Sequence, residues 1–232
     1  MNLEVNEKNL QFLKNDKIKI NAKNKIDGEE LLKTVCDGVV ATVFFDPQYR
    51  GVLDKMHYGN EGARQSQRVA LPQMDEGTIK SFIKEIYRVL KPSGYLFLWV
   101  DKFHLCQGIN EWIENTELQI VDLLVWNKGK IGMGYRTRRK SEYLIILQKK
   151  PIKAKAFWTD HAIPDVWDEK IESKNKKHPH SKPYELQKRL IEATTKEGEV
   201  VLDPASGGFT IYDICIATNR VFIGGDLTYG EI

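Results

Sequence analysis

The sequence is poor in cysteine and contains no long apolar run. Its three cysteines, Cys36, Cys106 and Cys215, lie far apart and form no Cys-x-x-Cys or Cys/His pattern. This spacing argues against a zinc site and against a disulfide framework. No apolar stretch approaches the roughly 18 residues that a membrane-spanning helix needs, and residues 1–17 lack the apolar segment of a secretion signal. We therefore expect a cytoplasmic protein with no membrane contact and no bound metal.

A strong excess of charge is also missing. The formal net charge is +3, which is too small to identify a nucleic-acid partner by itself. The basic residues are nevertheless clustered, in residues 136–140, 149–155 and 174–177. Such clusters are typical of proteins that bind the phosphate backbone, and equally of a solvated, lysine-rich surface. Composition therefore leaves both interpretations open.

Apolar runs rich in β-branched and aromatic residues alternate with amphipathic segments. The chain has 232 residues, 41% of them hydrophobic, which suffices for one buried core, so we expect a single domain over residues 1–232. The alternation predicts an α/β fold with a mainly parallel sheet that is buried on both faces. The expected strands are Val39–Phe45, Tyr95–Val100, Ile120–Trp126, Tyr143–Leu147, Val200–Leu202, Val221–Ile223 and, more weakly, Ile18–Ile20. The expected helices are Thr78–Leu90, Leu105–Glu114, Pro183–Thr195 and Ile211–Ala217.

Two stretches interrupt this alternation. Residues 50–73 are polar and contain three glycines, which predicts a long mobile loop. Residues 149–177 are basic and read as an irregular insertion. Its Trp158 and Trp167 either stack on nucleotides or anchor a small subdomain, and we favour anchoring. Long loops in compact domains are usually functional or disordered.

The first chemical motif is Asp46-Pro47-Gln48-Tyr49, directly after a buried strand. A carboxylate at the carboxyl end of such a strand points into the crevice where open α/β sheets bind ligands. The proline stiffens the backbone, and the tyrosine ring offers a stacking surface. Taken alone, the motif is also compatible with an ordinary turn at a strand end.

The second motif runs from Asp203 to Thr210 and forms a strand, a glycine turn and the start of a helix. That context suits the close approach of a nucleotide-like ligand to the backbone around Gly207 and Gly208. It is not a phosphate loop, because the Gly-Lys-Ser/Thr ending is absent. The next strand ends near Asp226, where a carboxylate can accept hydrogen bonds from two ribose hydroxyls.

Together these segments resemble the β-type amino-DNA methyltransferases. That family carries an Asp-Pro-Pro-Tyr-type catalytic motif first and an Asp-Pro-Phe-x-Gly-x-Gly cofactor motif near the C-terminus. The same order holds here from about Asp27 to Asp226, so chance agreement of short motifs is a poor explanation. The matching segments are Asp46–Tyr49, Arg88–Phe97, Trp126–Lys128, Lys177–Pro183 and Asp203–Thr210.

The resemblance implies a Rossmann-like, seven-stranded sheet with a circularly permuted strand order. It also implies S-adenosyl-L-methionine as cofactor, double-stranded DNA as partner and, since members are often dimers, a homodimer. The sequence departs from the family pattern at four positions. Gln48 replaces the second proline, Ala205 replaces the usual phenylalanine, Phe209 replaces the last glycine, and Gly208 is additional. We therefore expect a remodelled cofactor pocket.

The resemblance assigns the catalytic residues. Asp46 and the Pro47 carbonyl would accept the two hydrogens of the target amine, and direct methyl transfer would follow without a covalent enzyme intermediate. A base inside a duplex cannot reach such a site, so it would be flipped out and stacked on Tyr49.

The resemblance also assigns the cofactor residues. Asp27 would meet the cofactor's adenine, Asp226 its ribose, and Ser181 with Lys182 its carboxylate. The glycine turn would complete the pocket with Asp203, Ala205, Gly207 and Gly208. Two assignments have rivals, since Asp27 could simply cap a helix and Lys182 could lie on the surface.

DNA contacts are expected from the basic residues between two strands. Arginine can contact phosphates or read guanine edges, so both roles stay open for this cluster. Its members are Arg136, Arg138, Arg139 and Lys140. The insertion 149–177 is the expected target-recognition element, and the loop 50–73 is expected to close over the flipped base.

The activity implied is DNA (adenine-N6) methylation. The first alternative is methylation of the 4-amino group of cytosine, for which the family tends to use serine where Asp46 stands. RNA is a further alternative substrate. A different class of function is a DNA-binding subunit that kept the fold and lost turnover, although the retained Asp46-Pro47-x-Tyr49 motif and Asp226 favour an enzyme.

Overall fold

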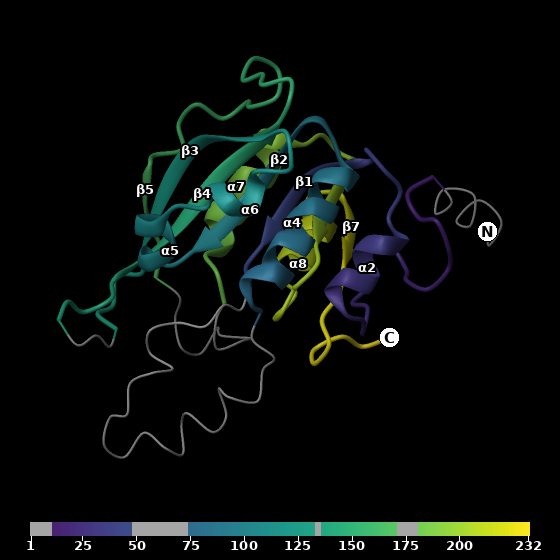
Figure 1. Ribbon diagram of the computed structural model, residues 1–232, viewed down its shortest axis with the longest axis horizontal. Helices are drawn as coiled ribbons and strands as arrows, with labels where there is room; N and C mark the ends of the chain where they lie inside the picture. The colour runs from purple at the N-terminus through teal and green to yellow at the C-terminus, as the bar shows by residue number, and fades with distance from the viewer. Residues whose placement is uncertain (1–10, 48–73, 133–135, 171–180) are drawn as a thin grey trace.

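The computed structural model describes residues 11–47, 74–132, 136–170 and 181–232, and these contain one seven-stranded sheet (Figure 1). The strand order is β5-β3-β4-β2-β1-β6-β7. The strands are β1 (Val40–Phe45), β2 (Leu90–Val100), β3 (Leu118–Asn127), β4 (Ser141–Lys149), β5 (Val166–Asp168), β6 (Val200–Asp203) and β7 (Val221–Gly224). Every pairing is parallel except those of β4 with β2 and β3. The mainly parallel sheet predicted from the sequence is confirmed.

The last two strands of the chain complete the sheet beside its first strand. β6 pairs with β1, and β7 pairs with β6, so C-terminal residues extend the half of the sheet that β1 begins. This is the circularly permuted order that the family resemblance implies. All strands but β4 point the same way, so their carboxyl ends share one edge of the sheet, called here the carboxyl edge. Ligands of open α/β sheets bind at such an edge.

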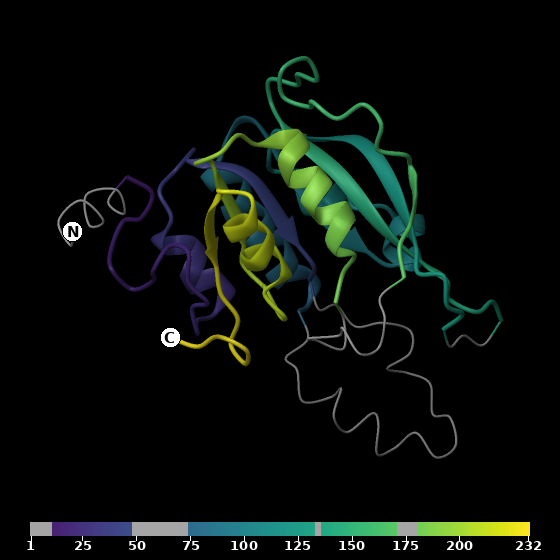
Figure 2. The same ribbon diagram turned by 180° about the vertical axis from the view of Figure 1, so that it is seen from behind.

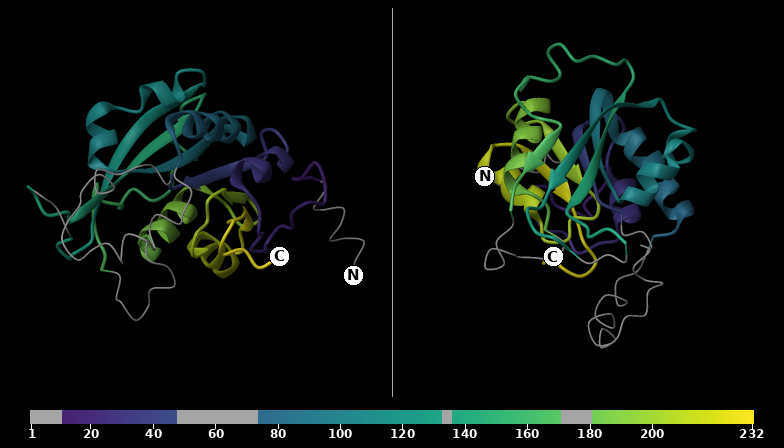
Figure 3. Two further views of the ribbon diagram at one scale, coloured as in Figure 1. Left: turned by 60° about the horizontal axis from the view of Figure 1, so that its bottom comes forward. Right: turned by 90° about the vertical axis from the view of Figure 1, so that its left-hand side faces the viewer.

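Helices cover both faces of the sheet (Figures 2 and 3). The helices are α2 (Gly28–Thr34), α4 (Glu76–Val89), α5 (Lys102–Gln107), α6 (Asn110–Ile113), α7 (Tyr184–Thr194) and α8 (Thr210–Ala217). The core between the sheet and α2, α4 and α6 is one apolar cluster, and α7 and α8 bury a second on the other face. β1 is buried along its whole length, as its unbroken apolar sequence requires. The sheet therefore holds the residues after β1 in a fixed position.

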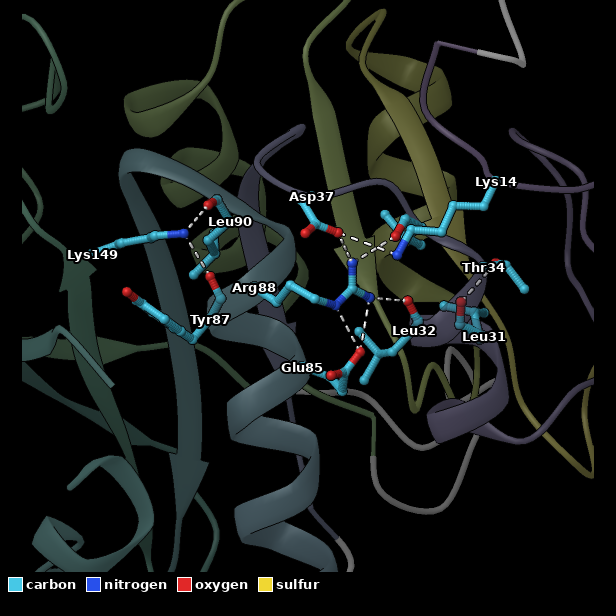
Figure 4. A network of polar contacts seen from close by, with 11 residues as sticks. Lys14, Leu31, Leu32, Thr34, Asp37, Glu85, Tyr87, Arg88, Leu90 and Lys149 are labelled. Carbon is cyan, nitrogen blue, oxygen red and sulfur yellow. Dashed lines mark hydrogen bonds and ion pairs between the residues drawn. The ribbon is translucent and has the colours of Figure 1, made fainter. Parts of the chain in front are cut away.

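Arg88, in the last turn of α4, joins this helix to α2 (Figure 4). Its guanidinium donates hydrogen bonds to the carbonyls of Leu32 at 2.7 Å and Val35 at 2.9 Å, at the C-terminus of α2. It also pairs with Glu85 and Asp37. One side chain thereby fixes α2, which carries Asp27 at its N-terminus, against α4.

Three expected elements differ from those observed. Residues 105–114 were expected to form one helix, but Gly108 adopts a φ of 84° and separates α5 from α6. The weak strand expected at Ile18–Ile20 is wrong. Ile18 is buried, but the segment is a turn, because the Asn24 side chain bonds both the N–H and the carbonyl of Lys19. The short strand β5 lies within the insertion that was expected to be irregular.

Candidate active site

Three aspartates lie at the carboxyl ends of three adjacent strands. Asp46 directly follows β1, Asp203 ends β6, and Asp226 follows β7. Burial raises the pKa of Asp203 to about 8, the Ala205 N–H opposes this shift, and the negative charges of Asp46 and Asp226 raise it further. The three carboxyl groups therefore lie close enough to interact electrostatically, and the edge that they share attracts positive charge.

Asp226 organises the glycine turn. Its Oδ2 accepts a hydrogen bond from the N–H of Gly207 at 3.1 Å, and its Oδ1 accepts from the N–H groups of Thr228 and Tyr229, both at 2.8 Å. Gly207 has a φ of 47°, a left-handed conformation that favours glycine. The turn after β6 and the segment after β7 are thus tied together at the predicted cofactor site.

The N-terminus of α2 packs closely against this turn. A Cβ atom on Gly28 would lie 2.4 Å from the carbonyl oxygen of Pro204 and 2.6 Å from the ring of Phe82. Asp27 is therefore held beside the glycine turn. Its Oδ1 accepts from the N–H groups of Glu29 at 2.9 Å and Glu30 at 3.2 Å, so it caps α2, as one of the two interpretations predicts.

Lys182 lies in the same site and not on the surface. Its Nζ is 2.9 Å from Oδ2 of Asp46 and 2.8 Å from Oε2 of Glu142, and it stands 4.8 Å from the ring centroid of Trp99. Burial opposes the charged form, but the two carboxylates outweigh it and raise the pKa of Lys182 above its ordinary value. The alternative of a surface lysine is wrong. Ser181 directly precedes Lys182, and the buried Pro183 that follows Lys182 is the N-cap of α7.

Glu142 is the member of this site that sequence reasoning missed. It is the second residue of β4, and because β4 is antiparallel to β2 and β3, the first residues of β4 lie at the carboxyl edge. Its Oε1 is 3.0 Å from Nζ of Lys128. Burial would raise the pKa of Glu142, but the charges of Lys182 and Lys128 prevail and lower it to about 2. The feature of the sequence that could have indicated Glu142 is its position directly before the predicted strand Tyr143–Leu147. The edge at which it lies depends on the direction of that strand.

The remaining predicted site residues are placed as follows. Pro47 is buried beside Asp46, Ala205 is half-buried against the first apolar cluster, and Gly208 is half-buried in the turn. Tyr49, and the predicted loop 50–73, lie outside the described residues. The structure therefore brings together Asp46, Lys182, Asp203 and Asp226 and holds Asp27 beside the glycine turn.

The predicted DNA-binding cluster lies on the connection between β3 and β4, which also leaves from the carboxyl edge (Figure 1). Arg136, Arg138 and Lys140 are exposed, and Arg139 is half-buried. Nζ of Lys102, the first residue of α5, lies 3.2 Å from the hydroxyl of Thr137 in this connection. The basic side chains therefore stand at the same edge as Asp46.

Much of the insertion 149–177 leaves from the opposite edge. β4 ends at Lys149, and the hydroxyl of Tyr95, near the start of the parallel part of β2, donates to the Lys153 carbonyl. Trp158 packs edge-on against Tyr95, at 5.7 Å between ring centroids, and Trp167 lies against the second apolar cluster. Both tryptophans thus occupy anchoring positions. β5 then leads back toward the carboxyl edge, and residues 171–177 lie outside the described part of the chain.

Among the described residues, no helix is long and apolar enough to cross a membrane, and no group of histidine, cysteine and acidic side chains could hold a metal ion. The carboxyl edge instead suits a ligand that carries positive charge. S-adenosylmethionine carries a sulfonium and an ammonium group, which suit an edge that presents the carboxylates of Asp46 and Asp226. Its carboxylate suits the ammonium of Lys182. The residues present therefore fit this cofactor.

Comparison with known proteins agrees with this geometry. The profile of the N6_N4_Mtase family, described as DNA methylase, matches residues 40–230. The type II methyltransferase M.HhaII of Haemophilus parahaemolyticus is 60% identical over 91% of this chain and 93% of its own length. The type II methyltransferase M2.DpnII of Streptococcus pneumoniae is 28% identical over 79% of this chain and 76% of its own.

Solved structures share the fold. The crystal structure of the M1.HpyAVI–SAM complex superimposes with a TM-score of 0.63 at 17% identity, over 88% of this chain and 92% of that one. The cytosine-N4-specific PvuII DNA methyltransferase gives a TM-score of 0.67 at 15% identity, over 90% and 85%. With the profile match and the 60% identity to M.HhaII, these findings place the chain in the family of N6/N4 amino-DNA methyltransferases, enzymes that take their methyl group from S-adenosylmethionine.

Proposed function

We propose that this DNA methyltransferase methylates the 6-amino group of adenine in a base flipped out of double-stranded DNA. The observation that carries the proposal is the position of Asp46. It is a carboxylate at the end of a fully buried strand, and it stands at the edge that also presents Asp203 and Asp226. A rigid strand places such a group with the precision that methyl transfer needs.

The chemistry requires an amine with an available lone pair. When bound, S-adenosylmethionine supplies a methyl group on a sulfonium, which is already a strong electrophile. The adenine amine is a weak nucleophile, because its lone pair is delocalised into the ring. Asp46 and the Pro47 carbonyl accept the two amine hydrogens and turn the lone pair toward the methyl group. Tyr49 stacks on the flipped base.

The proposed cofactor residues contact different parts of S-adenosylmethionine. Asp226 accepts hydrogen bonds from the ribose hydroxyls, in addition to the backbone groups that it already holds. Asp27 meets the adenine ring, and Ser181 with Lys182 receives the carboxylate. Asp203, Ala205, Gly207 and Gly208 line the turn, whose close packing against α2 leaves the backbone as the contact surface.

Methylation of the cytosine 4-amino group is the second candidate. The likeness to the PvuII enzyme, which is cytosine-N4-specific, supports it at the level of the fold. The first catalytic residue argues for adenine, since the family tends to use serine for cytosine and this chain has Asp46. The same amine chemistry would serve either base.

The surface proposed for DNA is the basic connection between β3 and β4. Arg136, Arg138, Arg139 and Lys140 stand there at the edge of Asp46 and can contact phosphates or guanine edges. For the insertion 149–177, we propose that target recognition belongs to the part after β5, because residues 150–163 begin at the opposite edge. A homodimer stays a prediction, which light scattering of the protein alone and with DNA tests.

Labelling of the methylated base tests the proposal. Unmethylated DNA is incubated with tritium-labelled S-adenosylmethionine and either the wild type or Asp46→Ala, and the DNA is digested to nucleosides. We expect label in 6-methyladenosine and a loss of at least about a hundredfold in the variant. Label in cytosine would favour the second candidate. No label and no cofactor binding by calorimetry would favour a DNA-binding subunit.

A further inference from the structure

The carboxyl edge carries a row of four alternating charges. Lys128 contacts Glu142 at 3.0 Å, Glu142 contacts Lys182 at 2.8 Å, and Lys182 contacts Asp46 at 2.9 Å. Each oxygen of Glu142 faces a different lysine. Glu142 therefore bridges the two ammonium groups, and Lys182 bridges the two carboxylates.

The Lys182 ammonium competes with the substrate for Asp46. Oδ2 of Asp46 faces that ammonium, yet the proposed role of Asp46 is to accept a hydrogen from the target amine. A carboxylate paired with a nearby ammonium is a weaker acceptor, because part of its charge is neutralised. A shift of the Lys182 ammonium away from Asp46 would therefore make Asp46 a stronger acceptor for the amine hydrogen.

Withdrawal is feasible because a second carboxylate already holds Lys182. The Lys182 side chain is 15% exposed, and a largely buried ammonium without a partner is costly. Glu142 keeps the ammonium paired when Asp46 turns to the amine. The charges of Lys182 and Lys128 keep the pKa of Glu142 low, so this second partner is ionised at neutral pH.

Two tryptophan rings on the sheet lie next to Glu142 and Lys182. Glu142 is paired across the sheet with Trp126, and Trp126 packs edge-on against Trp99 at 6.0 Å between ring centroids. The Lys182 ammonium stands over the Trp99 ring. Carboxylate and lysine are thus positioned by the same rigid part of the sheet.

We propose that Glu142 is a positioning residue, which draws the Lys182 ammonium toward itself so that Asp46 is a better acceptor for the amine of the target base. The inference rests on the proposed function, because Asp46 has to act as the acceptor. It adds a residue of the antiparallel strand β4 to the machinery, and Lys182 acts both as the temporary partner of Asp46 and as a ligand of the cofactor's carboxylate.

Glu142→Gln tests the inference, with Glu199→Gln as a matched control. Glu199 also pairs with a lysine, Lys91, and its side chain is 30% exposed against 32% for Glu142, but it precedes β6 at the other edge of the sheet. We expect Glu142→Gln to lower kcat at saturating DNA and cofactor by about tenfold to a hundredfold. Glu142→Asp should restore part of this loss, and Glu199→Gln should stay within about twofold of the wild type.

Lysine labelling gives a readout that does not depend on turnover. Reductive methylation consumes neutral amines, so each pKa unit lost by an ammonium accelerates it about tenfold. Mass spectrometry should show faster labelling of Lys182 in Glu142→Gln and unchanged labelling of Lys182 in Glu199→Gln. General loosening of the fold would instead accelerate labelling of lysines that Glu142 does not contact.

The outcomes separate the two proposals. Unchanged Lys182 labelling in Glu142→Gln, or a kcat equal to that of Glu199→Gln, would overturn the role of Glu142 even in an active methyltransferase. A wild type that labels no DNA would remove the proposed function, and with it the role in turnover. The labelling would then show only whether Glu142 pairs with Lys182.

Discussion

Asp203 carries a proton at neutral pH that the unfolded chain would not hold. Its pKa is about 8 in the fold, against 3.8 for an unperturbed aspartate, and burial is the main cause. Between these values the folded state binds more protons than the unfolded state, so this residue makes unfolding easier as the pH rises. Its contribution to stability is fully present below about pH 4 and is lost by about pH 8.

Asp203→Asn should flatten this dependence, because asparagine keeps the shape and takes up no charge. We expect the difference in unfolding free energy between variant and wild type to shift in favour of the variant from pH 5 to 8, by at most about 1.4 kcal/mol per pH unit. Urea titrations at four pH values measure it. The exposed Asp122→Asn on β3 serves as control, and a parallel pH profile for wild type and Asp203→Asn would contradict the prediction.

Single residues were predictable from the sequence where a motif placed them at a strand end. Asp46, Asp203 and Asp226 follow runs of apolar residues that predict buried parallel strands, and parallel strands bring their ends together. Glu142 could not be found in this way. Its position depends on the antiparallel direction of β4, and the run Tyr143–Leu147 looks the same in either direction.

Two glycines in the first turns of helices should respond in opposite ways to alanine. A Cβ atom on Gly28 would lie 2.4 Å from the Pro204 carbonyl oxygen, so Gly28→Ala has to displace α2 or the glycine turn, at a cost of about 1–3 kcal/mol. Gly77 of α4 is exposed, and its nearest contact would be the Asp75 side chain at 3.4 Å. Gly77→Ala should therefore stabilise the protein by about 0.5 kcal/mol through helix propensity.

Cofactor affinity distinguishes this packing effect from a general loss of stability. The displaced turn includes the backbone around Pro204 and Gly207, so calorimetry should show weaker cofactor binding for Gly28→Ala by about tenfold. Gly77→Ala should bind the cofactor as the wild type does. Equal affinities for Gly28→Ala and wild type would mean that α2 yields without moving the turn.

Elements were predictable where local pattern and tertiary packing agree. The apolar spacing of Ile79, Phe82 and Ile86 predicts a helix, and α4 buries that stripe. Prediction failed where long-range contacts decide. Ile18–Ile20 has the composition of a strand but pairs with no strand in the part of the chain that the structure describes, and the Asn24 side chain holds it in a turn. β5 is only three residues long, and it forms because it can pair with β3.

On the scale of the whole molecule, the two edges of the sheet separate two kinds of basic loop. The sequence shows basic residues in both 136–140 and 149–155, and nothing in their composition assigns either to DNA. The topology distinguishes them. The connection between β3 and β4 stands at the carboxyl edge with Asp46, and β4 then carries the chain to the opposite edge, where 150–155 begins.

Matched charge removal at the two edges tests this separation. Replacing Arg136, Arg138 and Lys140 by alanine should weaken DNA binding, and the plot of log affinity against log salt should lose about 0.9 in slope for each phosphate contact removed, up to about 2.7. Replacing Lys150, Lys153 and Lys155 removes the same charge from the far edge and should leave that slope nearly unchanged. Fluorescence anisotropy at several salt concentrations measures both. Because the net charge of the two triple variants is equal, equal slopes would mean that DNA responds to the overall charge of the protein. A loss of slope confined to the first variant would locate the DNA at the edge that holds Asp46.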